Sequence, residues 1–325
     1  MTAAISVVIP LHDKAPHIAH TLASVLAQTR PPDEIIVVDD GSTDGGAAVV
    51  EEFISQGVCL IRQENQGVSA ARNHGAMAAQ GSHIAFLDAD DEWLPNHIAT
   101  LYELIESWPQ AALFSTAHLI KREGKQYHAK SLFSKGWHGV VDDFFRSYAD
   151  GLSIVNSSTA CVRKSVMMQE GGFPVGIKRG EDIIFWIKMA LNYPVAHAAA
   201  HTAIYNQEAV NRTVKLRETE PPGSLIFLAQ ILRSAEVPTQ HRLGLGVLFN
   251  RIAFFTGAGF RMNGDLAGLN AIRRLALASG EWRVGLALLA ITLVPAPLLR
   301  LARRLRHRPA ALYQHTPRSS TALDG

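Results

Sequence analysis

The front half of the chain alternates between short apolar runs and longer segments with helical periodicity. Residues 5–11 form a β-branched apolar run, and Ile35 to Val38 are four consecutive apolar positions within residues 34–39. Runs of this kind are typical of strands that are buried on both faces of a parallel sheet. By the same pattern, further strands are predicted at residues 58–62, 83–87 and 113–120.

Helices are predicted between these strands, at residues 16–28, 46–55, 68–79 and 95–107. The last of them has Pro95 in its first turn, where proline is tolerated. The regular alternation of strand and helix predicts an α/β fold, with a mostly parallel, twisted sheet and helices on both of its faces.

The back part of the chain has a different pattern. From Leu225 onward it is helical and rich in Ala, Leu, Gly and Arg. Val284–Leu299 is a run of 16 residues without a charge, interrupted by Pro295 and Pro297. A bilayer span needs about 20 apolar residues, so this run is short for one. The arginines that follow it are Arg300, Arg303, Arg304, Arg306 and Arg308.

Charge separates the two parts further. Residues 221–325 hold 13 arginines, no lysine and 4 acidic residues, which gives a net charge of +9. Since the net charge of the whole chain is +2, residues 1–220 carry a net charge of −7. An apolar run beside a basic cluster predicts a helical extension at 221–309 that lies on an anionic membrane surface. A soluble extension packed on the front half is the alternative, and residues 310–325 are expected to form a flexible tail.

Composition indicates a globular protein and the cellular compartment in which it is expected. The chain is 47% hydrophobic and 18% charged, which predicts a packed core. Cys59 and Cys161 are too few for a disulfide framework, and the N-terminus shows no signal peptide pattern, so we expect a cytoplasmic protein. Nothing in the sequence indicates a nucleic-acid partner.

Three carboxylates follow the predicted strand at 83–87 within four positions: Asp88, Asp90 and Asp91. Like charges this close repel one another, so an uncompensated cluster costs stability. A divalent cation would remove that cost, and hard oxygen ligands suit Mg²⁺ or Mn²⁺. The carboxyl end of a strand is also where open α/β sheets bind ligands. A solvated acidic turn is the alternative interpretation.

A second acidic turn follows the predicted strand at 34–39, where Asp39 and Asp40 precede a glycine. Carboxylates there can accept hydrogen bonds from a base N–H or a ribose hydroxyl, although such residues also serve as turns and caps. The turn after the first strand, Pro10 to Lys14, has no glycine, and no P-loop motif occurs. A bound diphosphate would therefore need another neutralising group, such as a cation at residues 88–91.

Five motifs, in this order and spacing, resemble those of family 2 glycosyltransferases of the GT-A fold. They are Ser6-Val7-Val8-Ile9-Pro10, Ser24-Val25-Leu26-Ala27-Gln28-Thr29, Val37-Val38-Asp39-Asp40-Gly41-Ser42-Thr43-Asp44, Gly67-Val68-Ser69-Ala70-Ala71-Arg72-Asn73 and Asp88-Ala89-Asp90. The resemblance implies inverting transfer of a hexosyl group from a UDP-, GDP- or dTDP-linked sugar with Mg²⁺ or Mn²⁺. The acceptor would be a glycan or a lipid-linked hydroxyl, in the synthesis of cell-surface polysaccharide, lipopolysaccharide or glycolipid.

The resemblance also implies roles for single residues. The nucleotide-sugar part would be residues 1–110, and the acceptor part residues 111–220. Asp90 matches the metal-binding acid, and Asp91 is expected to help it. The nucleotide-sugar would contact Pro10, Asp39, Asp40, Arg72 and Asp88, with Pro10 and Asp40 at the nucleobase and Asp88 near the ribose.

Inverting transfer also needs a base, because the acceptor hydroxyl must lose a proton as it attacks. Gly180-Glu181-Asp182 precedes an apolar helical run and resembles the family's Glu-Asp motif, in which the aspartate is the base. We therefore predict Asp182 as the base, with Glu181 and Trp186 near the acceptor. Alternatively, the two acids only favour a helix N-terminus through its dipole.

Two other functions fit a sheet with an acid pair. A sugar-phosphate nucleotidyltransferase would usually carry a loop rich in glycine and basic residues after its first strand, and that loop is absent. A non-catalytic nucleotide-binding partner of similar fold is the other alternative. The presence of Asp40, Asp88, Asp90 and Asp182 together argues against it.

Overall fold

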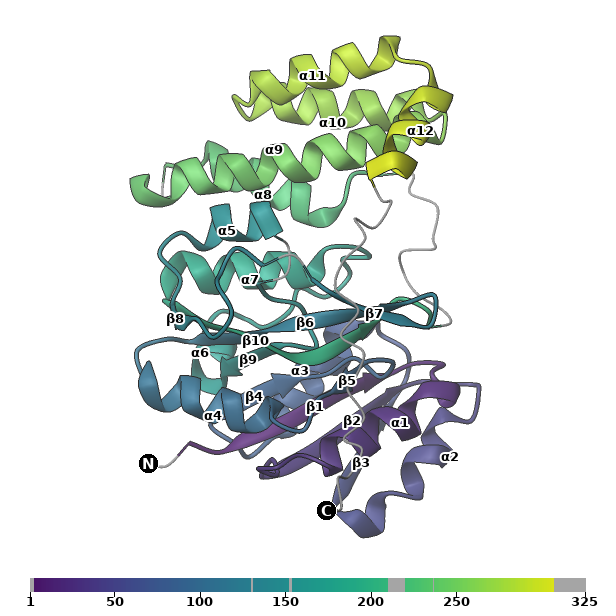
Figure 1. The fold of residues 1–325 in the computed structure, drawn as a ribbon, viewed down its shortest axis with the longest axis vertical. Helices are drawn as coiled ribbons and strands as arrows, with labels where there is room; N and C mark the ends of the chain where they lie inside the picture. The colour runs from purple at the N-terminus through teal and green to yellow at the C-terminus, as the bar shows by residue number, and fades with distance from the viewer. Residues whose placement is uncertain (1–2, 130, 152–153, 210–219, 236, 307–325) are drawn as a thin grey trace, which may run out of the picture.

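The computed structural model describes residues 3–306, apart from 130, 152–153, 210–219 and 236. A ten-stranded sheet with helices on both faces forms one part, and a layer of further helices lies beside it (Figure 1). The strands are β1 (Ile5–Leu11), β2 (Glu34–Asp40), β3 (Val58–Gln63), β4 (His83–Phe86), β5 (Glu92–Trp93), β6 (Leu113–Arg122), β7 (Lys125–His128), β8 (His138–Val140), β9 (Ala160–Arg163) and β10 (Val195–Asn206).

Helices are interspersed with these strands up to β10, and from α8 onward the helices follow one another. They are α1 (Ala15–Leu26), α2 (Gly46–Glu51), the 3₁₀ turn η1 (Ile54–Gln56), α3 (Val68–Ala78), α4 (His97–Ser107), α5 (Phe144–Gly151), α6 (Lys164–Gln169), α7 (Glu181–Asn192), α8 (Gly223–Arg233), α9 (Thr239–Met262), α10 (Leu266–Ala278), α11 (Trp282–Leu293) and α12 (Ala296–Arg306).

Four parallel strands in the order β3-β2-β1-β4 form one half of the sheet, as the sequence predicts. The other half is mixed. β9 lies antiparallel between β4 and β6, and β10 runs parallel to β6 but antiparallel to β5 and β8. The predicted α/β fold with helices on both faces is confirmed, with antiparallel strands added after β4.

Two helices differ from their predicted bounds. The helix predicted at residues 46–55 is divided, because α2 ends at Glu51 and the 3₁₀ turn η1 follows it. The helix predicted from Pro95 begins at His97, with Asn96 as its N-cap. The other elements predicted in the first 120 residues are present, with ends shifted by one or two residues.

The central strand β1 shows why a buried strand of this sheet has a continuous apolar sequence. All of its residues are buried. Ile5, Val7 and Ile9 pack with α1 and α4 on one face, whereas Val8 packs with α3 and α7 on the other. Since alternate side chains of a strand point to opposite faces, both faces of β1 must be apolar when both are covered.

Helix α3 lies unusually close to the sheet at Gly75. A Cβ atom at this position would lie 2.5 Å from Cγ1 of Val8 and 3.1 Å from Cγ2 of Val38. Neither valine can move aside easily in a close-packed interior, so only glycine permits this separation. Arg72 lies three positions earlier, on the same side of the helix.

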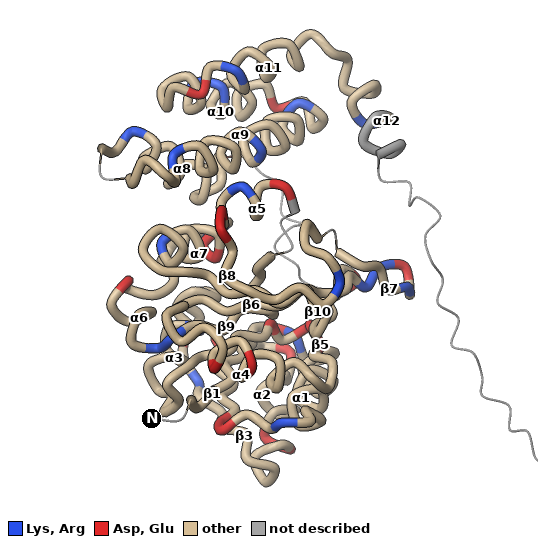
Figure 2. The backbone as a smooth tube through the Cα atoms, turned by 60° about the vertical axis from the view of Figure 1, so that its left-hand side comes forward, with Lys and Arg blue, Asp and Glu red and all other residues tan. Residues whose placement is uncertain are grey.

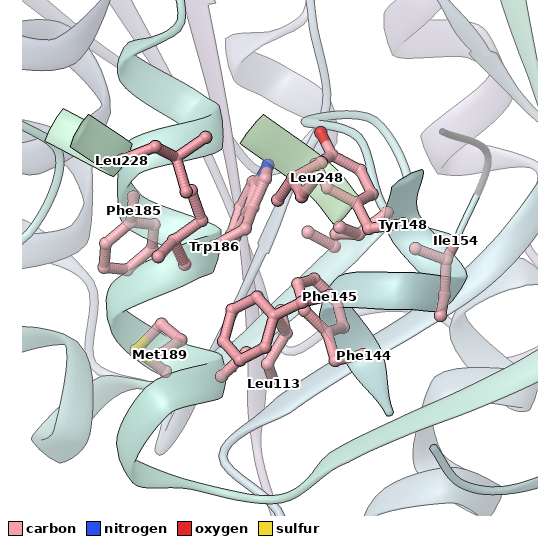
Figure 3. Close-up of a cluster of buried hydrophobic side chains, with 14 of the residues drawn as sticks. Leu113, Phe144, Phe145, Tyr148, Ile154, Phe185, Trp186, Met189, Leu228 and Leu248 are labelled. Carbon is pink, nitrogen blue, oxygen red and sulfur yellow. The ribbon is translucent and has the colours of Figure 1, made fainter. Parts of the chain in front are cut away.

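The helical layer shares a core with the sheet. One cluster of buried side chains extends from Val8 and Phe86 in the sheet through Phe185 of α7 to Phe249 of α9 and Leu288 of α11. Figure 3 shows the middle of this cluster, where α5, α7, α8 and α9 meet. The described part of the extension predicted at 221–309 therefore packs on the front half. The predicted tail at 310–325 lies outside the described residues.

The apolar run at 284–299 is not a single helix, as a membrane helix would be. α11 ends at Leu293, Val294 is extended (φ −81°, ψ 126°), and α12 starts at Ala296. Pro295 causes the break, because it lacks an N–H group and disfavours helical backbone in the residue before it. Among the described residues, the helix long and apolar enough to cross a membrane is instead α9, with 44% of its most apolar stretch buried.

Candidate active site

The acidic turns predicted from the sequence meet at one edge of the sheet. β1, β2 and β4 run parallel, with Leu11 opposite Asp39 and Val8 opposite Phe86. Their carboxyl ends therefore bring Asp39 and Asp40 to the same edge as the turn that begins at Asp88. Pro10 is buried near the end of β1, opposite Val38.

Asp40 is already engaged by the protein. Its Oδ1 accepts hydrogen bonds from Gln66 N and Gln63 Nε2, both at 2.8 Å, and its Oδ2 accepts one from Gly67 N at 2.8 Å. Asp39 Oδ1 accepts from Ser42 N at 3.0 Å. The two acids thus hold the loops after β2 and β3 in place. A nucleobase would have to donate to the lone pairs of the Asp40 carboxylate that these three hydrogen bonds leave open.

Arg72 joins the two predicted halves of the site. Its guanidinium lies 2.7 Å from Asp88 Oδ1 and 3.5 Å from Glu181 Oε1, and only 4% of its side chain is exposed. Burial alone would lower the pKa of Arg72, but Asp88 and Glu181 raise it above its ordinary value. This permanent cation also lies over the ring of Phe173, at 5.1 Å.

Asp90, the predicted metal ligand, has a cationic partner from another loop. Lys14 Nζ lies 2.7 Å from Asp90 Oδ2, and each side chain is 14% exposed. Lys14 is the N-cap of α1, in the turn after β1. This contact could not be predicted from the sequence, because 76 positions separate the two residues.

Asp91 is almost completely buried, and protein groups occupy its carboxylate oxygens, although it also contributes to the lining of the cavity described below. Its Oδ2 accepts a hydrogen bond from Ser158 Oγ at 2.5 Å, and its Oδ1 accepts one from Asn206 N at 2.8 Å. Ser158 Oγ in turn accepts one from Asp88 N at 3.1 Å. Burial, with Asp88 and Asp90 nearby, raises the pKa of Asp91 well above its ordinary value. These hydrogen bonds give Asp91 a structural role, and its predicted help to a metal stays a prediction.

Asp182 opens into a cavity of about 240 Å³ beside this turn. It lies in the first turn of α7, where its Oδ1 accepts from Ile183 N at 2.8 Å. Burial raises the pKa of Asp182, and Arg72 opposes the shift. Burial, together with the charge of Asp182, raises the pKa of Glu181 to about 7. The residues lining the cavity include Asp88, His118, Tyr148, Asn156, Asp182 and Tyr205.

Trp186 does not line the cavity. It is completely buried and packs against Phe173 and Phe185, in the cluster drawn in Figure 3. Trp186 therefore cannot touch a molecule in the cavity directly in this arrangement, and its place near the acceptor stays a prediction. Four positions separate Trp186 from Asp182, so it lies one turn further along α7, where the helix faces the core.

A divalent metal fits the acids at this edge. Within the described residues, no group of three or more His, Cys, Asp or Glu side chains is arranged to hold a metal alone. Mg²⁺ typically uses one or two carboxylates and completes its shell with substrate phosphates and water. Asp88 and Asp90 supply hard oxygens with partly exposed side chains, and the ammonium of Lys14 already occupies the position of a cation at Asp90.

Comparison with curated proteins gives relatives of similar kind. Glycosyltransferase GlyA of Streptococcus pneumoniae is 31% identical over 46% of this chain and 21% of its own length. The putative teichuronic acid biosynthesis glycosyltransferase TuaG of Bacillus subtilis is 33% identical over 37% of this chain and 49% of its own length. The chain thus spans between a fifth and a half of the length of these relatives.

Two solved structures share the fold. S. aureus TarS in complex with UDP-GlcNAc has a TM-score of 0.72 at 21% identity, over 93% of this chain and 87% of that one. The mannosyltransferase PcManGT from Pyrobaculum calidifontis, in complex with GDP-Man and Mn²⁺, has a TM-score of 0.58 at 18% identity, over 94% and 81%.

The predicted resemblance is confirmed at the level of the family. The family model described as Glycosyl transferase family 2 matches residues 6–169, which include the acidic turns after β2 and β4 and the arginine between them. We conclude that the chain belongs to glycosyl transferase family 2 and has a GT-A type fold.

Proposed function

We propose that this enzyme transfers a hexosyl group, with inversion, from a UDP-, GDP- or dTDP-linked sugar to a hydroxyl of a glycan or lipid-linked acceptor. The product would belong to a cell-surface polysaccharide, a lipopolysaccharide or a glycolipid. The observation that supports the proposal is a single cavity lined by Asp88 of the donor turn and Asp182 of α7. The ligands in the two structural neighbours and the teichuronic acid relative support the same class of substrates.

In the proposed reaction, Asp182 acts on the acceptor, and Asp88 and Asp90 act on the leaving diphosphate. The acceptor oxygen would attack the anomeric carbon while the bond from that carbon to the diphosphate oxygen breaks, and the hydroxyl proton would pass to Asp182. Burial raises the pKa of Asp182, which makes it a better proton acceptor than an exposed aspartate. A Mg²⁺ or Mn²⁺ ion at Asp88 and Asp90, when bound, would stabilise the negative charge of the departing diphosphate.

A nucleotidyltransferase is less well supported. It would act on a nucleoside triphosphate and a sugar phosphate, which need basic groups after β1. The turn from Pro10 to Lys14 contains a single basic residue and no glycine to let a triphosphate approach the backbone. A carboxylate base facing the donor turn across a cavity also has no role in that reaction.

The donor proposal predicts that Asp90→Asn weakens Mn²⁺-dependent binding of UDP by about 10- to 100-fold. The variant keeps the size of the side chain but loses the charged oxygen that a metal needs. Calorimetric titration of UDP with and without Mn²⁺ measures the effect, and circular dichroism checks the fold. Asp142→Asn, an exposed acid elsewhere, is the matched control. An unchanged Mn²⁺ response in Asp90→Asn would show that the metal binds elsewhere.

The helical layer offers a surface for a lipid-linked acceptor. Trp282, Leu286, Leu289 and Leu293 lie on one side of α11 and are 44% to 85% exposed, whereas Leu288 on the other side is buried. Basic residues recur along this layer, and few acidic residues accompany them (Figure 2). Exposed apolar surface with basic neighbours suits peripheral binding to an anionic leaflet, and we propose the inner face of the cytoplasmic membrane.

Arg300, the first arginine after the apolar run, also has a structural contact. Its guanidinium donates to the Met262 carbonyl at the end of α9, at 2.6 and 3.0 Å. It therefore holds α12 against α9, while the residue itself is exposed and keeps its positive charge.

The membrane proposal predicts that the double variant Leu286→Glu/Leu293→Glu sediments with anionic vesicles at least tenfold more weakly than the native protein. Each exposed leucine would otherwise bury apolar area worth about 1.5–3 kcal/mol when fully covered. High salt should release part of the native protein, because it screens the basic residues. Ile54→Glu, an exposed apolar position in η1, is the control. Equal sedimentation of all three proteins would show that α11 does not bind the membrane.

A further inference from the structure

The cation beside Asp90 is supplied by the chain itself. The Lys14 ammonium lies 2.7 Å from Asp90 Oδ2, and both side chains are 86% covered by protein, so the pair is partly shielded from water. Asp88 has the Arg72 guanidinium, and Asp91 has two hydrogen bonds from uncharged donors. Each acid of the turn thus has a partner of its own before any substrate or metal arrives.

A metal at Asp90 and the ammonium at Asp90 exclude each other. An ammonium at hydrogen-bond distance from a carboxylate occupies the space in which a divalent ion would bind the same oxygen, and the two positive charges repel at that distance. For Mn²⁺ to coordinate Oδ2 of Asp90, or both oxygens of this carboxylate, the side chain of Lys14 must therefore leave.

The position of Lys14 gives its side chain somewhere to go. As the N-cap of α1 its backbone is fixed, because its carbonyl accepts hydrogen bonds from His17 N and Ile18 N at 2.9 and 3.1 Å. Its flexible four-carbon chain can still turn about that point. The N-terminus of α1 adds positive potential at the same edge of the sheet, and lysine binds phosphate well as a point charge.

We propose that Lys14 is a built-in counter-ion of the donor site, which a divalent metal displaces from Asp90 and which then binds the diphosphate of the donor. The inference rests on the proposed metal and donor site and adds an exchange of cations to it. Lys14 keeps the acidic turn neutral when no metal is present. It adds a second positive charge to the diphosphate when a metal is bound.

The first test is binding of Mn²⁺ alone, without nucleotide, followed by electron paramagnetic resonance. Lys14→Met should bind Mn²⁺ about tenfold more tightly than the native protein, because the metal no longer has to break a charge-assisted hydrogen bond. Lys125→Met, an exposed lysine at the start of β7, is the control and should not change the affinity. Lys14→Gln serves as a second variant, since it keeps a hydrogen-bond donor and removes only the charge.

The second test is calorimetric binding of UDP at saturating Mn²⁺, where the metal has displaced Lys14 from Asp90. Both Lys14 variants should bind UDP several-fold more weakly than the native protein and than Lys125→Met. Unchanged UDP affinity would overturn the proposed contact with the diphosphate.

The outcomes separate this inference from the proposed function. If the native protein and both Lys14 variants bind Mn²⁺ equally, and Asp90→Asn weakens all of them, the metal site stands and the exchange of cations is wrong. If Asp90→Asn leaves Mn²⁺ binding unchanged, the metal assignment fails, and the exchange at Asp90 fails with it.

Discussion

Replacing Asp182 with asparagine is expected to lower kcat by about 10²- to 10⁴-fold, with little change in the affinity for the donor. The substitution keeps the size of the side chain and the hydrogen bond from Ile183 N to its oxygen, but removes the group that would accept the acceptor's proton. General base assistance is typically worth a factor of this size. Initial rates with saturating donor, together with calorimetric binding of the nucleotide, measure the two quantities separately.

The control for this experiment is Glu52→Gln, an exposed acid near the end of α2. Glu181→Gln should have a smaller effect than Asp182→Asn, because Glu181 pairs with Arg72 and does not line the cavity. If Asp182→Asn keeps most of its turnover while Glu181→Gln loses it, then Glu181 is the base and Asp182 is not.

The second large effect is expected from Arg72→Met, which should lower the free energy of unfolding by about 3 kcal/mol at pH 8. Removing one partner of a buried ion pair leaves an uncompensated charge, and losses of 3–5 kcal/mol are typical. Arg72 is 4% exposed and serves two carboxylates, Asp88 and Glu181. Urea unfolding followed by circular dichroism measures the change.

The loss in Arg72→Met should also depend on pH. The pKa of Glu181 is raised in the folded protein to about 7, from an ordinary value of 4.5, so the folded state binds more protons and stability falls as pH rises between those values. Arg72 lowers this pKa, so its removal extends the fall to higher pH. The deficit of the variant should therefore be larger at pH 8 than at pH 5.

The matched control for this experiment is Arg62→Met, which breaks an ion pair with Glu51 at the surface. An exposed pair contributes about 0.2–1 kcal/mol, and it lacks the buried acid that gives Arg72 its pH dependence. Equal losses in the two variants would mean that the guanidinium of Arg72 is solvated and does not hold the two halves of the site together.

The parallel half of the sheet and β6 could be predicted from the sequence, but the short strands of the mixed half could not. β1 and β2 are apolar on both faces, so their residues form unbroken runs that are easy to recognise. β5, β8 and β9 have two to four residues each and carry no such run. They exist because β10 and β6 offer them unpaired backbone groups, which is a property of the assembled sheet.

Some residues of the candidate site could likewise be predicted from the sequence, and others could not. The acids at 39–40, 88–91 and 181–182 follow strands or begin a helix, and the sequence marks such positions. Lys14 and Ser158 could not be found, because each meets the acidic turn through tertiary contacts about 70 or more positions away. The complete burial of Trp186 could not be predicted either, because its spacing of four from Asp182 places it on the same face of α7 but does not show how deeply that face is covered.

The close approach of α3 at Gly75 makes a residue that touches no ligand important for activity. The position of the α3 backbone determines how far the guanidinium of Arg72 extends over the acids, and a single methyl group at Gly75 would push the helix outward against Val8. Surveys that rank natural variants by their distance from the substrate would score Gly75 as tolerant. Glycine at this position sets the distance between α3 and the sheet, and with it the position of Arg72. Enzyme engineers who seek an altered donor preference should therefore leave Gly75 unchanged.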